Sequence, residues 1–90
     1  NDEASARNTF EAFQAAGHEG ILLRGDATCE EDVATMTAEI AERLGPVDVA
    51  VVNATPDQPQ RPIEEYDWAF YQSMLDFFVK SPFLLTRAVL

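Results

Sequence analysis

Basic residues are scarce in this chain of 90 residues. Six Lys and Arg stand against 16 Asp and Glu, which gives a formal net charge of −10. Tight binding to nucleic acid or to an anionic membrane surface requires a basic patch, and the sequence provides none. We therefore expect neither nucleic acid nor membrane as a partner, and we interpret the acidic residues mainly as a solvated surface.

Cysteine, histidine and long apolar runs are also nearly missing. Cys29 has no second cysteine to pair with, and His18 stands alone, so the sequence predicts neither an internal disulfide nor a metal centre. No apolar run is long enough to span a bilayer, and no signal peptide is present. These features fit a reducing, cytoplasmic location.

Helical periodicity predicts two amphipathic helices in the first half of the chain. The first covers residues 2–16 and ends before Gly17, which suits a left-handed position. The second extends from about Glu30 to Leu44, before Gly45 and Pro46. Thr28 and Glu31 have the spacing of a capping box, so Thr28 is the predicted N-cap.

Two apolar segments predict strands, at residues 20–24 and 47–55, and the second strand is predicted to be buried on both faces. The second is mostly β-branched and leads into a Pro- and Gln-rich loop at residues 56–62, of the kind that borders ligand sites. A third helical region extends from Ile63 onward, and Pro82 is predicted either to kink it or to begin a second helical piece. Its many aromatic residues predict cover on more than one side, for example by a second subunit.

This order of elements predicts an α/β fold. Helix, strand, helix, strand and helix alternate, which is typical of a Rossmann-like, doubly wound parallel sheet. Two strands are too few for a stable sheet, and the chain begins and ends within predicted helices. We therefore expect residues 1–90 to be a single segment of a larger domain, incomplete at both ends.

Several short motifs occur in a characteristic order along the chain. They are Gly25-Asp26-Ala27-Thr28, Gly45-Pro46-Val47-Asp48-Val49, Val52-Asn53-Ala54-Thr55 and Ser81-Pro82-Phe83-Leu84-Leu85-Thr86-Arg87-Ala88. Together they resemble the middle of the short-chain dehydrogenase/reductase family, whose patterns are G-D-V-T-D, G-x-[IVL]-D-x-L-V-N-N-A-G and N-x-x-G-x-F-x-x-T-x-A. The resemblance spans essentially the whole chain.

The resemblance implies cofactor contacts at five residues. Asp26 matches the acidic residue beside the adenine ring, with the Ala27 backbone next to it, and Asn53, Ala54 and Thr55 match the turn on the adenine-ribose side. The implied cofactor is NAD or NADP, and the implied substrate is a small alcohol or carbonyl compound. The resemblance also implies a homo-oligomer formed through the helical region at residues 66–90.

Some positions depart from the family pattern. Thr55 replaces a glycine, Val52 replaces the first asparagine, and Phe78 stands where the catalytic-relay asparagine is usual. Lys80 is interpreted as a solvated helix residue rather than as a replacement for that asparagine. Asn53 has an alternative interpretation, in which it bonds only to neighbouring loop backbone.

The glycine-rich motif T-G-x-x-x-G-x-G and the pair Y-x-x-x-K do not occur in these 90 residues. We therefore predict no catalytic residue here and no hydride transfer by this chain alone, while the parent protein is expected to be an NAD(P)-dependent oxidoreductase. Two alternatives stay open: a non-catalytic relative, and an assembly or interaction module built on residues 66–83.

Overall fold

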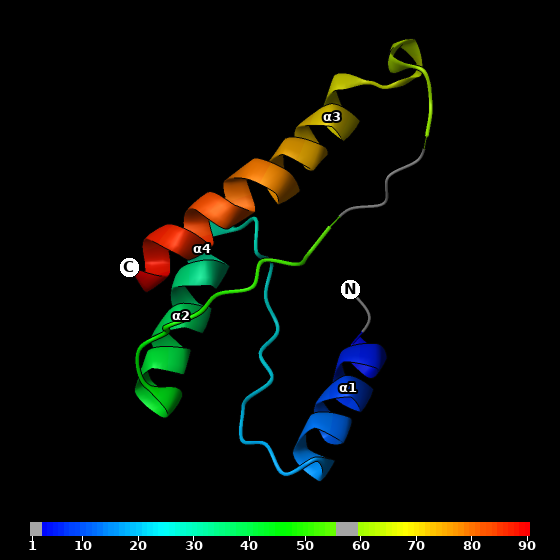
Figure 1. The fold of residues 1–90 in the computed structure, drawn as a ribbon. Coiled ribbons are helices and arrows are strands. Elements are labelled where there is room, and N and C mark those ends of the chain that lie inside the picture. The colour runs from blue at the N-terminus through cyan, green and yellow to red at the C-terminus, as the bar shows by residue number, and fades with distance from the viewer. Residues whose placement is uncertain (1–2, 56–59) are drawn as a thin grey trace.

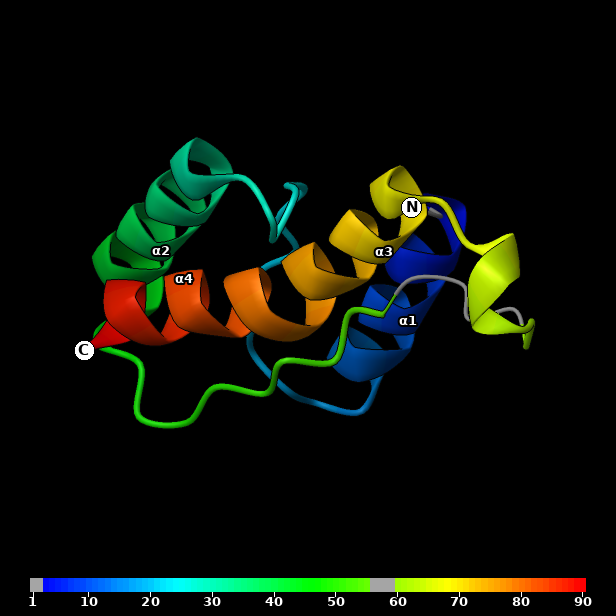
Figure 2. The same ribbon diagram turned by 90° about the horizontal axis from the view of Figure 1, so that it is seen from above.

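The computed structural model describes residues 3–55 and 60–90, and its regular elements there are helices (Figures 1 and 2). The α-helices are α1 (Glu3–Ala15), α2 (Glu30–Leu44), α3 (Trp68–Leu75) and α4 (Ser81–Val89). A short 3₁₀-helix, η1 (Ile63–Glu65), precedes α3, and a π-helical turn, η2 (Asp76–Lys80), joins α3 to α4. Most of the predicted loop at residues 56–62 lies outside the described residues.

The first two predicted helices are confirmed. Helix α1 falls within the predicted range, and α2 has the predicted bounds. Gly17 and Gly45 follow these helices with φ angles of 90° and 94°, a backbone region that favours glycine. In the described part of the chain, no helix has the length and apolar character that crossing a bilayer requires.

The predicted cap of α2 is wrong. Cys29 is the N-cap residue, and its side chain makes no capping hydrogen bond. The Thr28 hydroxyl donates instead to Asp26 Oδ1 at 2.7 Å. Because this hydroxyl is held by the preceding turn, the capping-box spacing to Glu31 has no structural effect.

The predicted Rossmann-like parallel sheet is also wrong, since residues 3–55 and 60–90 contain no β-strand. The segments at residues 20–24 and 47–55 are irregular connections that run past the helices (Figure 1). Val49 and Val51, expected inside a sheet, are 80% and 85% exposed. A strand is defined by ladder hydrogen bonds to a neighbour, and no described residue supplies them to either segment. An apolar, β-branched composition is therefore not sufficient to form a strand when no neighbouring segment pairs with it.

The core lies between α2 and α4, which pack directly against each other (Figure 2). Val33 on α2 and Leu84 on α4 are its buried apolar side chains, and Ser81 is fully buried beside them. Arg87 Nη2 and Glu30 Oε1 form an ion pair at 2.7 Å across this contact. The radius of gyration is 15.5 Å, whereas a compact chain of this length is expected to have a radius of gyration of about 12 Å. The part of the chain that packs between α2 and α4 is therefore small relative to its full length.

Helices α3 and α4 form one continuous rod through η2 (Figure 2). Pro82 has no N–H, and its ring would clash with the carbonyl four residues earlier in a regular α-helix. The chain adjusts by forming a π-helical turn before Pro82, in which the Ser81 N–H donates to the Asp76 carbonyl. The predicted second helical piece is thus confirmed, with Pro82 in the first turn of α4.

Candidate functional site

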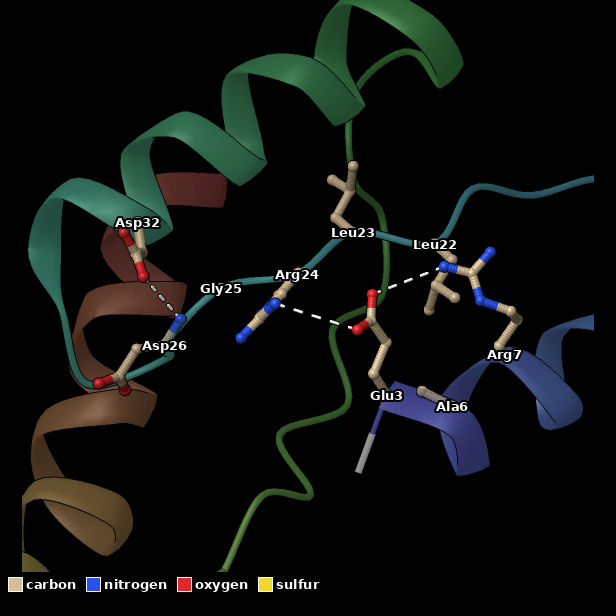
Figure 3. A pocket seen from close by; sticks show the side chains of 9 residues that line it. All are labelled: Glu3, Ala6, Arg7, Leu22, Leu23, Arg24, Gly25, Asp26 and Asp32. Carbon is tan, nitrogen blue, oxygen red and sulfur yellow. Dashed lines mark hydrogen bonds and ion pairs between the residues drawn. The ribbon is translucent and has the colours of Figure 1, made fainter. Parts of the chain in front are cut away.

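A pocket of about 670 Å³ lies between α1, the segment at residues 22–26 and the first turn of α2 (Figure 3). Its lining combines charged and small apolar side chains: Glu3, Ala6, Arg7, Leu22, Leu23, Arg24, Gly25, Asp26 and Asp32. These residues come from three parts of the chain. The pocket therefore depends on how the turn at Asp26 joins the connecting segment to α2.

Hydrogen bonds fix the turn at Asp26. Asp26 Oδ1 accepts from the Thr28 backbone N–H at 2.8 Å and from the Thr28 hydroxyl at 2.7 Å. The Asp26 N–H donates to Asp32 Oδ2 at 2.8 Å, which ties the turn to α2 (Figure 3). Aspartate followed by threonine two residues later is a common way to build such a turn.

The same contacts hold the Asp26 carboxylate in its charged form. The hydrogen bond from the Thr28 hydroxyl, and then that from the Thr28 N–H, lower the pKa of Asp26 below its ordinary value. Burial opposes them, and the positive charge of Lys80 adds a smaller lowering contribution. Asp26 Oδ2 receives no hydrogen bond from any residue that the structure describes. It is therefore available to accept a hydrogen bond from a ligand.

Gly25 allows this turn to lie close to α2. A Cβ atom at Gly25 would lie 2.6 Å from Met36 Sδ and 2.9 Å from Met36 Cε. A larger residue would push the Met36 side chain away or move the turn. The G-D-A-T motif thus has a packing role at Gly25 beside the polar role of Asp26.

Two guanidinium groups share one carboxylate in the other part of the pocket. Arg7 Nη2 lies 3.5 Å from Glu3 Oε1, and Arg24 Nη1 lies 4.0 Å from Glu3 Oε2. All three side chains are more than 60% exposed, and both distances exceed that of a good charge-assisted hydrogen bond. Most donors of both arginines are therefore uncommitted within the described residues.

A second pocket, of about 650 Å³, is apolar. It lies between α1, residues 20–22 and the end of α2, and its lining is Ser5, Ala6, Thr9, Phe10, Phe13, Gly20, Ile21, Leu22 and Leu44. Phe13 stacks on Phe10 and contacts His18, with ring centroids 6.1 and 5.1 Å away. This aromatic contact gives His18 a packing role in the turn after α1.

The structure places the five predicted cofactor residues in two separate regions. Asp26 lines the first pocket, and Ala27 follows it in the same turn. Asn53, Ala54 and Thr55 are exposed in the connection after α2 and line neither pocket. The structure therefore does not gather the five residues into one pocket.

Sequence analysis did not single out Arg7 and Arg24. A partial signal exists, because Arg24 precedes Asp26 by two residues and Arg7 follows Glu3 by one helical turn. Phe78 and Lys80, which were considered for the relay position, lie exposed in η2. Residues 3–55 and 60–90 contain no group of three His, Cys, Asp or Glu side chains arranged to hold a metal ion.

Comparison with known proteins identifies the protein family of this chain. A family model described as enoyl-(acyl carrier protein) reductase matches residues 1–90. The chain is 32% identical over 71 residues to cis-4-hydroxycyclohexanecarboxylate dehydrogenase of Sinomonas cyclohexanicum, covering 79% of this chain and 28% of that protein. It is 23% identical over 83 residues to a hydroxynaphthalene reductase of Aspergillus fumigatus, covering 92% of this chain and 30% of that protein.

The chain belongs to the short-chain dehydrogenase/reductase family of oxidoreductases, as its motifs indicated. It spans less than a third of the length of these two relatives.

Proposed function

We propose that this chain is part of an NAD(P)-dependent oxidoreductase that acts on a small alcohol or carbonyl compound, and that it provides the adenine-side contacts to the cofactor. The observation that carries the proposal is the Asp26 carboxylate. One of its oxygens is held by Thr28 at 2.7 and 2.8 Å, and the other has no partner among the described residues. A fixed, ionised acceptor at the wall of a pocket suits the exocyclic amine of adenine.

Backbone groups would complete this contact. Ala27 is small and follows Asp26 directly, so a ring can approach its backbone closely. Asn53, Ala54 and Thr55 are exposed, which leaves their polar groups accessible to a ligand. We assign them to the adenine-ribose side of the cofactor on the basis of the N-A-G pattern that they resemble.

The cofactor would supply the hydride, and residues 1–90 would bind and orient it rather than move the proton. This division follows from the sequence, because neither a glycine-rich phosphate motif nor a Y-x-x-x-K pair occurs within these residues. We therefore assign residues 1–90 to a larger cofactor-binding domain.

Binding of reduced cofactor to the full-length protein tests this proposal. Nicotinamide fluorescence would be followed during titration with NADH and with NADPH. Asp26→Asn keeps the shape of the side chain but removes its charge, and we expect it to weaken binding of both cofactors by about tenfold, because a hydrogen bond to a charged group is lost. Glu42→Gln, on the exposed side of α2, is the charge-matched control and should leave binding unchanged.

Two results would contradict the proposal. If neither cofactor binds the wild-type protein, the assignment to an NAD(P)-dependent enzyme fails. If cofactor binds without turnover of any alcohol or ketone, the protein is a non-catalytic relative.

A second role, self-association, is favoured by the surface of α3 and η2. Trp68, Tyr71, Leu75, Phe78 and Val79 recur at spacings of three or four residues, and each is between 37% and 68% exposed. An exposed apolar stripe of this kind marks an interaction surface. We propose that the helical region at residues 66–90 forms a contact between copies of the protein.

Light scattering of the full-length protein tests the contact. Val79→Asp places a charge at the C-terminal end of the stripe, so the oligomer should dissociate, whereas Glu64→Gln in η1 should not change the measured mass. A wild-type protein that stays monomeric at high concentration would contradict this role.

A further inference from the structure

Neighbouring groups hold Asp26 at its backbone as well as at its side chain. Its N–H donates to Asp32 Oδ2 at 2.8 Å, and its carbonyl oxygen accepts the Cys29 N–H at 3.0 Å. Its Oδ1 accepts both the N–H and the hydroxyl of Thr28. Among the described residues, Oδ2 is thus the one polar atom of Asp26 without a partner, and these bonds fix the direction in which it points.

Asp32 makes the contact that joins this turn to the neighbouring helix. Thr28 and Cys29 belong to the same turn as Asp26, so their hydrogen bonds set only its internal shape. Asp32 lies six residues after Asp26, in the first turn of α2, and lines the same pocket (Figure 3). Its hydrogen bond therefore sets how the turn, and with it Asp26 Oδ2, is oriented relative to α2.

Helix α2 provides a fixed place for Asp32. Val33, the next residue, is 2% exposed and belongs to the core between α2 and α4. Glu30, in the same first turn, forms the ion pair with Arg87 of α4. A polar side chain held by a packed element orients its partner more precisely than one on a loop does. Asp32 is therefore well placed to orient Asp26.

The helix dipole alone does not account for this contact. The first turn of α2 contains three acidic residues, Glu30, Glu31 and Asp32, and each is favourable near the positive end of the dipole. Glu30 and Glu31 are exposed, whereas Asp32 is half-buried and bonds back to the turn. In a capping box the corresponding residue bonds to the N–H of the N-cap, here Cys29. Asp32 bonds instead to the Asp26 N–H, which indicates a role at Asp26.

From these contacts we infer that Asp32 is a positioning residue, which makes the site selective for adenine by aiming Asp26 Oδ2 at the exocyclic amine. The inference rests on the proposed function, because that function places adenine at Asp26. A carboxylate accepts hydrogen bonds but donates none, so it favours the amine of adenine over the carbonyl that hypoxanthine carries at the same position. This selection requires a fixed acceptor, because a mobile side chain turns away from the carbonyl at little cost.

Fluorescence titration of the full-length protein tests the inference. It compares the reduced cofactor that binds more tightly, NADH or NADPH, with the analogue in which hypoxanthine replaces adenine. We expect the wild-type protein to prefer the adenine cofactor by about tenfold and Asp32→Ala by about twofold, because the acceptor is no longer aimed. Asp32→Asn should keep the preference, since its amide oxygen still accepts the Asp26 N–H. Glu31→Ala, which removes an exposed acid from the same turn, is the matched control and should also keep it.

The preference is a ratio of two affinities, so a partial loss of folded protein does not change it. Hydrogen exchange of the Asp26 amide provides a second readout, which should be slow in the wild-type protein and in Asp32→Asn and fast in Asp32→Ala. An unchanged preference in Asp32→Ala, or an equal loss in Glu31→Ala, would overturn the inference, while weaker binding by Asp26→Asn would leave the proposed function standing. A wild-type protein without any preference for adenine over hypoxanthine would contradict the adenine contact of the proposed function itself.

Discussion

The contact between α2 and α4 and the connection at residues 46–55 differ sharply in how much of their apolar surface is buried. Val33 and Leu84 are 2% and 5% exposed, whereas Val49 and Val51 are 80% and 85% exposed. Both regions are rich in aliphatic residues. The helices satisfy their backbone hydrogen bonds locally and then need only one neighbour to bury a face, while an extended segment needs a second chain segment for its hydrogen bonds as well. Composition alone therefore does not decide burial.

Shortening a core side chain should have the largest effect on stability. Leu84→Ala removes most of a buried side chain, and we expect it to lower the free energy of unfolding by about 3 kcal/mol. Val51→Ala, in the exposed connection, should change it by less than about 0.5 kcal/mol. Urea unfolding followed by circular dichroism at 222 nm measures both. Equal losses would show that the connection is as well packed as the helices.

Removing the buried hydroxyl should increase stability. Ser81 Oγ is fully buried and has no hydrogen-bond partner among the residues that the structure describes, so Ser81→Ala should raise the free energy of unfolding by about 1 kcal/mol. Ser73→Ala is the control. The Ser73 hydroxyl donates to the Phe70 carbonyl at 2.6 Å, so its removal should not raise the free energy of unfolding. A destabilised Ser81→Ala protein would indicate that the hydroxyl has a partner in solution.

The ion pair between α2 and α4 should contribute less to the free energy of unfolding than the buried side chains do. Arg87 and Glu30 are 54% and 71% exposed, so solvent screens their interaction. A double-mutant cycle with Arg87→Gln and Glu30→Gln should give a coupling of about 0.5 kcal/mol that decreases in high salt. A coupling insensitive to salt would mean that the pair is more protected than its exposure indicates.

The turn at Asp26 should show a small dependence on pH. The pKa of Asp26 is lowered in the folded chain, first by the Thr28 hydroxyl. Its stabilising contribution is therefore complete above the ordinary value of 3.8 and is lost as the pH falls through the lower folded-state value. Thr28→Ala should raise the pKa toward 3.8, as measured by NMR titration of the Asp26 carboxyl. An unchanged titration would exclude the hydroxyl as the main cause.

Local signals predicted the helices well. Periodicity, Gly17, Gly45 and Pro82 act within one or two turns of chain, and the ends of α1 and α2 and the start of α4 agree with them. The N-cap of α2 was missed because the Thr28 hydroxyl can bond either to the Asp26 carboxylate or to the backbone of α2. Sequence spacing alone does not show which of these two hydrogen bonds forms. The strands were wrong because hydrogen bonding between strands depends on partners that a local pattern cannot supply.

The candidate site was predicted only in part. The resemblance to the family pointed to Asp26, and the structure places it in the wall of a pocket. Arg7 and Arg24 were not foreseen, because they come together only through the path between α1 and α2. Asn53, Ala54 and Thr55 lie in a connection whose position no local pattern sets. Residues on one turn were therefore easier to assign than residues on separate segments.

The π-helical turn at η2 has a geometric consequence for the whole rod. A π turn closes over one residue more than an α turn, and one residue of α-helix corresponds to a rotation of about 100°. Side chains after η2 are therefore out of phase with those before it. The apolar stripe that starts at Trp68 is exposed before this turn, whereas Leu84 is buried after it, so one continuous rod carries an interaction surface in its first half and a contact with the core in its second.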